Sequence, residues 1–489
     1  MSLRRVRIRQ GAYVDSARLM SVSRSMAQRD DVEWASAVMG TAANLETLRQ
    51  EGFEDVSGAG ANDLVLAVRA ASEDGAEDAF AAAGDALGGG QQGGEREQRR
   101  ARTLDEARDR VPDANVAIVS VPGEYAALEA HKALTAGLHV LLFSDHVPVD
   151  DELELKRRGA DRGLFVMGPG AGTAVLGGVG LGFANAVDRG GVGVVAGAGT
   201  GAQEVMTLLD RWGAGLSHLV GVGGGDLGER VRGSMTHMAV RALADDPDTE
   251  VLLLVSKPPD PEVASEVLGD LGALPAVAAL VGVGDDFSAP GGVRVASSMD
   301  EAVRQVLGLL DMPVPDPGAG LADRAGAEAE RLGPDRRAVR GLFSGGTMCY
   351  ETMVVASRRL GPVYSNTPLR DDWGLPAPEG AHICLDVGEE EFTRDRPHPM
   401  IDVESRVELI EREGADPATA VVLMDVVLGH GAHPDPAEVL APVCEKVSSQ
   451  RDAPVVMAYV CGSDTDPQDR GEQCRRLREA GCVLAPTGA

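Results

Sequence analysis

Apolar and polar residues alternate along the middle of the chain in a pattern typical of buried parallel strands separated by helices. Continuous apolar runs of strand length occur at 116–122 (VAIVSVP), 139–144 (HVLLFS) and 163–168 (GLFVMG), with helical spacing of apolar residues between them. The same rhythm continues in the runs VGVVAG, SHLVGVG, VLLLVS and AVAALVGV. Strands that are buried on both faces of a parallel sheet have such unbroken apolar runs. The pattern therefore predicts an α/β protein with doubly wound parallel sheets.

Two segments of different composition divide the chain into three blocks. Residues 84–102 are rich in Gly and charge, and residues 311–337 are rich in Pro, Gly and Ala, as expected of linkers. The middle block divides near residue 166 into a Rossmann-like unit and a flavodoxin-like unit. The sequence thus predicts a small α+β domain, a Rossmann-like domain and two flavodoxin-like domains, at 1–83, 103–165, 166–310 and 338–489.

The first block alternates strand-like and helix-like patterns. It predicts strands at 4–9, 32–39 and 63–69 and helices at 15–29, 42–51 and 75–83. This order fits a small α+β domain, for which a ferredoxin-like arrangement is one option.

The last block repeats the second half of the middle block. The segment VGVVAGAGTGAQE (192–204) corresponds to VRGLFSGGTMCYE (339–351), because each is an apolar run, a Gly-rich turn and Gly-Thr-x-x-x-Glu opening a helix. Further pairs follow in the same order, 250–267 with 420–439 and 274–284 with 453–463, with extra residues at roughly 366–400. We interpret this as an internal duplication with an insertion in the second copy, although a generic α/β rhythm can produce part of the likeness by chance.

Charge and cysteine content exclude several classes of function. The formal net charge is −30 and the chain has four lysines, so we expect it to bind neither nucleic acid nor an anionic membrane. A solvated acidic surface is the simplest explanation of this charge. The N-terminus has no apolar signal region and no stretch reaches the length of a membrane span. All six cysteines lie in the last third and none forms a CxxC pair, which favours reduced thiols in the cytoplasm.

Glycine-rich turns at strand ends are the candidate ligand sites, because open α/β sheets bind ligands there and glycine lets the backbone approach an anion. Tight turns alone are the competing interpretation. For Glu204 and Glu351, stabilisation of the helix N-terminus is a competing role. The predicted phosphate or substrate-binding residues are Gly168, Gly170, Gly172, Thr173, Gly199, Thr200, Gly201, Gly223, Gly224, Gly225, Asp226, Ser344, Gly345, Gly346 and Thr347.

Cationic and titratable residues near these turns extend the candidate site. Lys257 ends a predicted strand, and either an anion contact or a plain surface position fits it. The segment RPHPMID (396–402), which we match to VGVGGGDLGE (220–229), supplies Arg396 and His398. His430 and His433 in GHGAHPDP are candidate catalytic residues together with His398. Histidines that bond backbone carbonyls are the alternative, and no third ligand at metal spacing follows, so we predict no metal site.

The whole chain resembles the FdrA family, which is related to succinyl-CoA synthetase. The resemblance rests on MGTAAN, PDANVAIVSVPGEYAALEA, MGPGAGTA, VGVGGGDL, VSKPP, GLFSGGT, RPHPMID and GHGAHPDP. It implies a Rossmann-like CoA-binding-type domain followed by two CoA-ligase-type flavodoxin-like domains, which the synthetase divides between its α and β subunits. CoA, phosphate or an acyl phosphate is then the expected ligand, and a small anionic substrate the expected partner.

The departures from the synthetase pattern affect the expected activity. The stretch that corresponds to its phosphohistidine loop, LVGVGDDFSAPGG (280–292), has no histidine, and no ATP-grasp domain can be found, which leaves ATP or ADP use in doubt. Some members of the FdrA family are linked to purine and allantoin breakdown as one component of an oxamate carbamoyltransferase. The resemblance therefore implies acyl or carbamoyl transfer through an acyl-phosphate-type substrate, in a homo-oligomer or with subunits from neighbouring genes. An ADP- or GDP-forming acyl-CoA ligase and a non-catalytic ligand-binding subunit are the alternatives.

Overall fold

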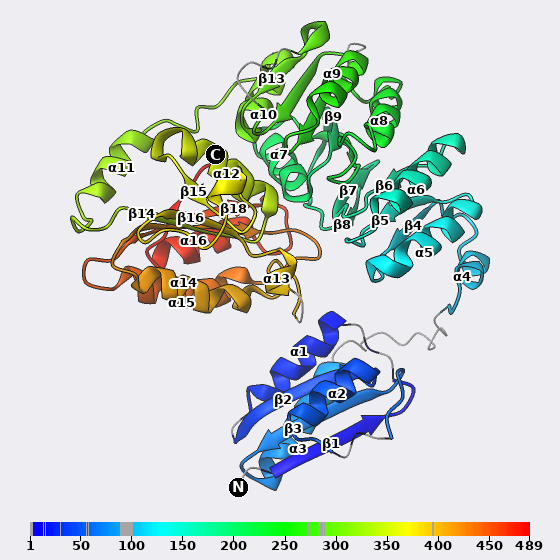
Figure 1. The fold of residues 1–489 in the computed structure, drawn as a ribbon, viewed down its shortest axis with the longest axis vertical. Coiled ribbons are helices and arrows are strands. Elements are labelled where there is room, and N and C mark those ends of the chain that lie inside the picture. Colours follow the sequence, from blue (N-terminus) through cyan, green and yellow to red (C-terminus); the bar gives the residue numbers. More distant parts are fainter. Residues whose placement is uncertain are drawn as a thin grey trace. The chain divides into compact units, whose positions relative to one another are not determined.

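The chain forms two compact units, residues 1–101 and 102–489. The computed structural model describes residues 3–12, 14, 16–29, 31–54, 56, 58–88, 101–271, 274–283, 287, 289–393 and 396–489 (Figure 1). Most of the predicted linker at 84–102 lies outside the described residues, and so does part of the stretch 280–292. Among the described residues, no helix combines the length and apolar character that a bilayer crossing requires.

The first unit is a three-stranded antiparallel sheet with helices on both faces. Its sheet order is β1-β3-β2. One core contains residues of α1 and α3 and a second core contains residues of α2. The described order is strand–helix three times over, so the four-stranded β-α-β-β-α-β order of a ferredoxin-like fold is not found there. Every predicted element is confirmed, as β1 Leu3–Arg9, α1 Ser16–Ala27, β2 Val32–Met39, α2 Ala42–Gln50, β3 Leu64–Ala70 and α3 Glu73–Gly88.

The second unit begins with the Rossmann-like part, a parallel sheet of three strands in the order β4-β5-β6. The strand β6 pairs with β5 and lies just beyond the predicted boundary at 165, so the domain extends at least to Met167. Helices precede and separate the strands, as the apolar spacing predicts. The elements are α4 Leu104–Arg110, β4 Val116–Val119, α5 Gly123–Thr135, β5 His139–Leu142, α6 Val149–Asp161 and β6 Val166–Met167.

The next part, which we call the first repeat (168–310), is a seven-stranded sheet in the order β13-β12-β11-β9-β10-β7-β8. The strands from β13 to β10 are parallel, and β7 and β8 form an antiparallel hairpin at the edge. Its strands are β7 Thr173–Leu176, β8 Val179–Gly182, β9 Arg189–Ala196, β10 Leu216–Gly221, β11 Val251–Ser256, β12 Ala276–Leu280 and β13 Arg294–Ala296. Its helices are α7 Gly199–Arg211, α8 Ser234–Ala244, α9 Pro261–Asp270 and α10 Met299–Leu309.

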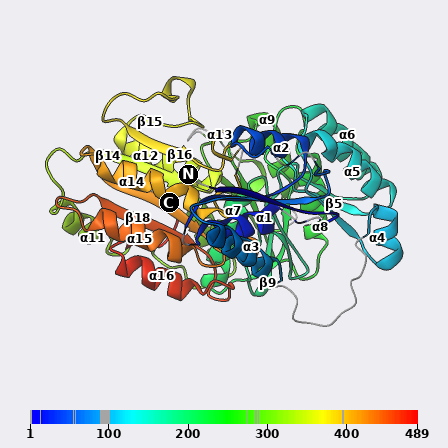
Figure 2. The same ribbon diagram turned by 90° about the horizontal axis from the view of Figure 1, so that it is seen from below.

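The last part, the second repeat (338–489), is a parallel sheet in the order β15-β16-β14-β17-β18-β19. It lies between α12 on one face and α14, α15 and α16 on the other (Figure 1), and Figure 2 looks onto it from the side of α14 and α15. Its strands are β14 Ala338–Phe343, β15 Val363–Tyr364, β16 His382–Asp386, β17 Thr419–Val427, β18 Val455–Cys461 and β19 Val483–Leu484. The helices are α12 Gly346–Leu360, α13 Glu390–Thr393, α14 Val407–Ala415, α15 Pro436–Ser448 and α16 Arg470–Glu479, and the predicted linker 311–337 contains α11, Leu321–Ala329.

The two sheets share the strand arrangement that an internal duplication predicts. In the first repeat β9 lies between β10 and β11, and in the second repeat β14 lies between β16 and β17, with two further strands beyond β11 and β17. Each central strand leads directly into a helix, α7 or α12, that begins with the Gly-Thr element. In the second repeat, β15 lies between α12 and β16, and the predicted extra residues 366–400 begin in the loop after β15. The carboxyl ends of β9 and β14, where ligands bind in such sheets, therefore carry equivalent helix starts.

Candidate functional site

The two Gly-Thr elements meet in the structure, although they lie 147 residues apart. The backbone N–H of Thr347 donates to the Thr200 hydroxyl at 3.3 Å. A Cβ on Gly345 would lie 2.8 Å from the Thr200 side chain, and a Cβ on Gly201 would lie 2.9 Å from the Thr347 side chain. Glycine is needed at both positions because any side chain there would push the two helix starts apart.

The glutamates of the two elements form a reciprocal pair of contacts between the repeats. The backbone N–H of Gly488 in the second repeat donates to Glu204 Oε1 of the first repeat at 3.0 Å. In turn, the backbone N–H of Met299 in the first repeat donates to Glu351 Oε1 of the second at 2.6 Å. Neither glutamate lies in the first turn of its helix, so the predicted role in stabilising the helix N-terminus is wrong.

Both of these carboxyl groups are fully buried, which alters their protonation. Burial raises the pKa of Glu204 from 4.5 to about 7, against the opposing effects of the Tyr459 hydroxyl and the Gly488 N–H. Burial and the negative charge of Glu204 raise the pKa of Glu351 from 4.5 to about 8. A protonated carboxyl can lie here without the full cost of a buried charge. The pair thus joins the repeats and does not face a ligand.

The start of α7 is one of the predicted anion sites. Within the described residues, no protein acceptor receives the backbone N–H groups of Gly199, Thr200 or Gly201, and no side chain caps this helix. A small cavity of about 10 Å³ adjoins it, large enough for about one water molecule. Predicted site residues from three loops line this cavity together with backbone of the helix start; they include Gly170, Gly172, Thr173, Gly199, Gly223 and Gly224. The structure therefore brings together three of the predicted glycine-rich turns, those of Gly170, Gly199 and Gly223.

Close packing of backbone accounts for several of the same glycines without a ligand. Gly168 has a φ of +114°, and a Cβ there would strike the carbonyl of Leu142. Gly223 has a φ of +86°, and a Cβ there would lie 2.5 Å from the carbonyl oxygen of Pro169. The Thr173 hydroxyl donates to the carbonyl of Phe183 at 2.7 Å. Packing between loops thus requires these residues, whatever they bind.

The predicted binding residue Asp226 is the centre of a buried structural cluster. Its carboxylate accepts from Lys156 Nζ at 2.7 Å, from the Thr236 hydroxyl at 2.6 Å and from the Thr236 N–H at 2.9 Å. Lys156 also donates to Glu152 at 2.7 Å, and its side chain is 1% exposed. A Cβ on Gly225 would lie 2.9 Å from the Glu152 carboxylate. Asp226 therefore joins α8 to α6 through α6's buried lysine.

At the start of α12, a group of polar side chains from both repeats comes together. A Cβ on Gly346 would lie 3.5 Å from Lys257 Nζ and would touch the Asp386 carboxylate. A Cβ on Gly388 would lie 2.7 Å from His398 Nε2 and 3.2 Å from Asp386 Oδ1. Lys257, Asp386 and His398 thus surround the beginning of this helix, and we call them the Lys–Asp–His cluster.

The protonation of this cluster suits acid–base chemistry near neutral pH. Burial raises the pKa of Asp386 from 3.8 to about 6, although the charge of Lys257 lowers it. Burial lowers the pKa of His398 from 6.5 to about 4, so this ring is neutral. Its Nδ1 accepts from the Met400 N–H at 3.3 Å, which leaves the hydrogen on Nε2. Lys257 is the one lysine of four that makes no ion pair within the described residues.

Sequence reasoning missed Asp386 because it matched the wrong segments. We paired VGVGGGDLGE with RPHPMID, but the sheet register aligns Gly221 with Asp386, since they lie beside the equivalent residues Ala196 and Phe343. The true counterpart of the turn after β10 is therefore Asp386–Gly388. A carboxylate at the end of an apolar strand, ICLD, was the available signal.

The other predicted histidines lie in a separate loop that packs on the first repeat. His430 is exposed, and its backbone N–H donates to the carbonyl of Ala184 at 2.8 Å. His433 is buried, and its Nδ1 accepts from the Asp435 N–H at 3.1 Å. No hydrogen bond joins either ring to the Lys–Asp–His cluster among the described residues. Arg396 is exposed, and its catalytic or binding role stays a prediction, as do those of the two histidines.

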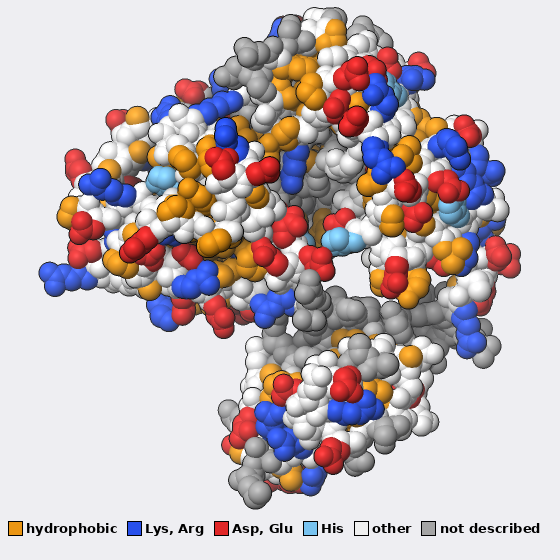
Figure 3. Space-filling view, in the orientation of Figure 1, with side chains coloured by type: hydrophobic (Ala, Val, Ile, Leu, Met, Phe, Trp, Pro, Cys, Tyr) orange, Lys and Arg blue, Asp and Glu red, His pale blue; other side chains and the backbone are white. Residues whose placement is uncertain are grey.

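The Rossmann-like part faces the same region through the loop that follows β5. Phe143 packs on Phe183 with ring centroids 5.6 Å apart, and Phe183 lies 6.4 Å from the His398 ring. His146 Nε2 lies 3.7 Å from the carboxylate of Glu390 in α13. The molecule is hollowed between the lobe of β4–β6 and the lobe of α12 and α13, with acidic and histidine side chains at the edge (Figure 3). These contacts delimit a cleft at the carboxyl ends of the strands.

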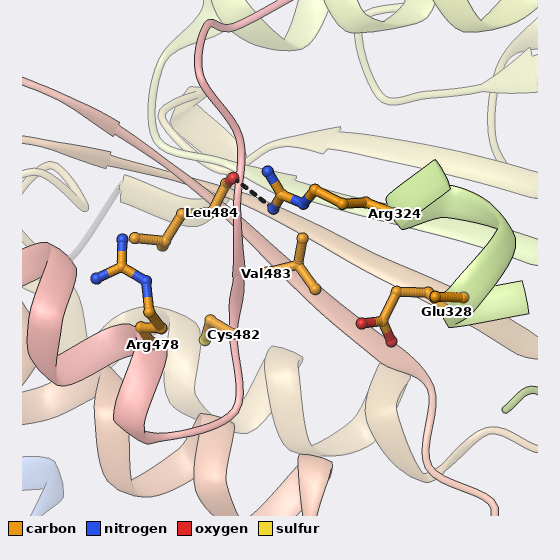
Figure 4. A pocket seen from close by; sticks show the side chains of 7 residues that line it. Arg324, Glu328, Arg478, Cys482, Val483 and Leu484 are labelled. Carbon is orange, nitrogen blue, oxygen red and sulfur yellow. Dashed lines mark hydrogen bonds between the residues drawn. The ribbon is translucent and has the colours of Figure 1, made fainter. Parts of the chain in front are cut away.

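A further pocket of about 370 Å³ lies at the edge strand β19. Arg324 and Glu328 from α11 and Arg478 from α16 surround it, and Arg324 donates to the carbonyl of Leu484 at 3.1 Å (Figure 4). Because β19 pairs with the beginning and middle of β18, the pocket lies away from the carboxyl ends of the strands. It contains no counterpart of the Lys–Asp–His cluster.

Thiol and metal chemistry have little support in the described residues. No group of three or more His, Cys, Asp or Glu side chains there has the geometry of a metal site. Burial raises the pKa of the Cys349 and Cys461 thiols and raises that of Cys384 to about 12. Such thiols remain protonated and are poor nucleophiles.

Two family models match parts of the chain. A model described as "AllF, heavy metal-associated domain" matches residues 1–103, and a CoA-ligase model matches residues 342–489. Residues 1–103 contain neither cysteine nor histidine, so this segment offers neither a thiolate nor an imidazole ligand for a heavy metal.

Comparison with known proteins gives similarities along the whole chain and over parts of it. The uncharacterized protein YahF of Escherichia coli is 36% identical over 98% of this chain and 95% of its own. The α subunit 2 of the ADP-forming succinate–CoA ligase of Archaeoglobus fulgidus is 30% identical over 38% of this chain and 64% of that subunit. An ATP citrate lyase of Methanothrix soehngenii, solved with citrate and coenzyme A, aligns over 46% of both chains at 17% identity and a TM-score of 0.37. The chain therefore belongs to the family of YahF, within the superfamily of succinyl-CoA synthetase-like CoA ligases.

Proposed function

We propose that this protein is an FdrA-type component of an acyl or carbamoyl transferase that uses an acyl-phosphate-type substrate. The observation that carries the proposal is the Lys–Asp–His cluster beside two helix starts, in a cleft formed by three α/β parts. An acyl phosphate needs a site for its phosphate, a donor for its carbonyl oxygen and a base for the incoming nucleophile. This cleft offers residues for each of these tasks.

In the proposed reaction, the nitrogen of an amide or amine acceptor attacks the carbonyl carbon of carbamoyl phosphate. The C–N bond forms, the bond from the carbonyl carbon to the phosphate oxygen breaks, and inorganic phosphate leaves. The Asp386 carboxylate accepts the proton that the nitrogen loses, and the neutral His398 donates its Nε2–H to the carbonyl oxygen. Lys257 and the open N–H groups of α7 hold the phosphate.

An acyl-CoA ligase is the second candidate, because the CoA-ligase model matches 342–489 and the succinate–CoA ligase α subunit aligns with the chain. The protein would then bind CoA and depend on another subunit for the nucleotide. The stretch 280–292 lacks the histidine that a phosphohistidine relay requires, which favours transfer from an acyl phosphate. A homo-oligomer, or a complex with subunits from neighbouring genes, is part of both proposals.

The two candidates are separated by following carbamoyl phosphate and CoA in the same preparation. The full chain, alone and with the products of neighbouring genes, is incubated with carbamoyl phosphate and oxamate, and phosphate release is measured. A second reaction contains CoA, succinate and ATP, and acyl-CoA is measured. Phosphate release that requires oxamate supports the first proposal. Acyl-CoA formation without oxamate-dependent phosphate release favours the ligase. No turnover in either reaction refutes both proposals.

A lysine pair tests the phosphate site itself. Lys257→Met should weaken inorganic phosphate binding by about tenfold, because a lost charge contact to an anion costs about 1.4 kcal/mol or more. Lys446→Met is the matched control, since Lys446 is an exposed lysine that pairs with Glu411 at 2.8 Å in α14. Equal phosphate affinity in both variants, measured by titration calorimetry, would argue against Lys257 as a phosphate ligand.

A further inference from the structure

Tyr350 lies on the same face of α12 as Gly346, about one helical turn further along. Residues four apart share a helix face, and Gly346 is the position that Lys257 and Asp386 surround. Lys257 Nζ lies 6.0 Å from the centroid of the Tyr350 ring, which is the range of a cation–π contact. The helix therefore presents a phenol beside the lysine of the Lys–Asp–His cluster.

The hydroxyl of Tyr350 reaches the carboxyl ends of two strands of the first repeat. Gly282 lies two residues beyond β12, and Pro258 lies two residues beyond β11. A Cβ on Gly282 would lie 2.7 Å from the Tyr350 hydroxyl oxygen and 3.1 Å from the Pro258 ring. Open α/β sheets bind ligands at such strand ends. A side chain of the second repeat thus adds a polar group to the ligand-binding edge of the first.

Packing fixes the Tyr350 ring and leaves its polar end without a protein partner. The half-buried ring contacts the apolar cores of both repeats. Within the part of the chain that the structure describes, no hydrogen bond joins the hydroxyl to another group. Tyrosine hydroxyls that are removed from bulk water usually have a partner. Burial raises the pKa of this hydroxyl, so it stays protonated and can donate to an anion at neutral pH.

The same position of the first repeat has the opposite character. The two Gly-Thr elements align Gln203 of α7 with Tyr350 of α12. The Gln203 side chain is buried, and its amide donates to Asn185 Oδ1 at 3.3 Å and to the Leu428 carbonyl at 3.5 Å. In the first repeat this position therefore uses its polar group to join the repeats. In the second repeat its polar group has no such bond and lies beside Lys257.

We infer that the Tyr350 hydroxyl and the Lys257 ammonium bind one oxyanion together, and that this oxyanion is the phosphate of the acyl-phosphate substrate. The inference rests on the proposed function, because it adds a binding residue to the cleft of that function. The ammonium is a point charge on a flexible stem, whereas the packed ring holds one O–H donor in a fixed place. The pair thus supplies both attraction and position for a phosphate oxygen.

Tyr350→Phe tests the hydroxyl alone, because phenylalanine keeps the packed ring. Titration calorimetry of the full chain with inorganic phosphate should show an affinity about tenfold lower, since a hydrogen bond to a charged group is lost. Tyr125→Phe, at a tyrosine of α5 that is 56% exposed, is the matched control and should bind phosphate like the wild type. In a Lys257→Met background the same Tyr350→Phe change should cost less, because both groups hold one anion. Equal phosphate affinity in the wild type and Tyr350→Phe would overturn the inference.

Oxamate distinguishes the phosphate from the other oxyanion of the proposed reaction, the carboxylate of the acceptor. A Tyr350→Phe protein that loses affinity for oxamate and keeps its affinity for phosphate would overturn the assignment to phosphate. Oxamate-dependent phosphate release from carbamoyl phosphate tests the proposed function separately. Release by the wild type together with equal phosphate affinities would overturn the inference and leave the function intact. Weaker phosphate binding by Tyr350→Phe, without release by any preparation, would support the binding pair and refute the transfer reaction.

Discussion

Glu351→Gln should change how the stability of the protein depends on pH. Glutamine keeps an oxygen for the Met299 N–H, which donates to Glu351 Oε1 at 2.6 Å, and it cannot ionise. The Oε2 atom of Glu351 has no hydrogen-bond partner among the described residues, so an amide nitrogen in its place breaks no bond. The substitution therefore isolates the effect of the charge at this site.

The size of the effect follows from the pKa of Glu351, which burial and Glu204 raise from 4.5 to about 8. Below about pH 4.5 the carboxyl is protonated in both the native and the unfolded protein, and it has no effect on the pH dependence. Between about pH 4.5 and 8 the unfolded protein loses the proton while the native protein keeps it, so the wild type loses stability as the pH rises. At about 1.4 kcal/mol for each pH unit between the two pKa values, the loss approaches about 5 kcal/mol above pH 8.

Guanidinium unfolding of the full chain from pH 4.5 to pH 9, followed by circular dichroism, measures this difference. The wild type and Glu351→Gln should differ least at the acidic end, and the variant should be the more stable above pH 8. Glu445→Gln, at an exposed position of α15, is the control and should follow the wild type. A variant that loses stability with rising pH as steeply as the wild type would refute a raised pKa at Glu351.

Two further predictions concern other buried charges. Lys156→Met should lower the free energy of unfolding by about 3–5 kcal/mol, because it leaves the Glu152 and Asp226 carboxylates buried without their cation. The control Lys132→Met changes an exposed lysine that pairs with Glu129, and it should lower the free energy of unfolding by at most about 1 kcal/mol. Equal losses in the two variants would contradict this account. If Asp386 accepts the proton during acyl or carbamoyl transfer, the transfer rate should rise with pH through about 6, and Asp386→Asn should abolish this rise. A rise that persists in the variant would exclude Asp386 as the base.

Much of the fold can be predicted from the sequence because buried parallel strands need continuous apolar runs. The runs at 116–122 and 139–144 contain β4 and β5, and each Gly-Thr element lies between a strand and a helix, as its composition predicts. The helix spacing and the alternation in the first block likewise locate its six elements. The local pattern does not give the boundary of the Rossmann-like part, because tertiary contacts set it: β6 pairs with β5 and belongs to the same sheet.

The candidate site is less accessible to sequence reasoning because it depends on which strands are neighbours. The match of RPHPMID with VGVGGGDLGE follows the order of similar letters, whereas the sheet register places Asp386 at the equivalent strand end. Asp425 lies inside the apolar run VVLMDVVL, and a charge at such a position is a signal that sequence reasoning can use. The Arg406 side chain donates to Asp425 Oδ1 at 2.9 Å from a different element, and no local pattern predicts this partner.

The sequence by itself determined the α/β class, the duplication and the pairing of a glycine turn with each of two helix starts, because these follow from local backbone and burial requirements. Only the tertiary structure decided what each repeated residue does. It brings Glu204 and Glu351 together as buried contacts between the repeats, and it pairs the Asp425 carboxylate with the N–H groups of Ser344 and Gly345, which precede α12. The physical reason is that a carboxylate's role depends on its burial and its partners, and long-range packing sets both.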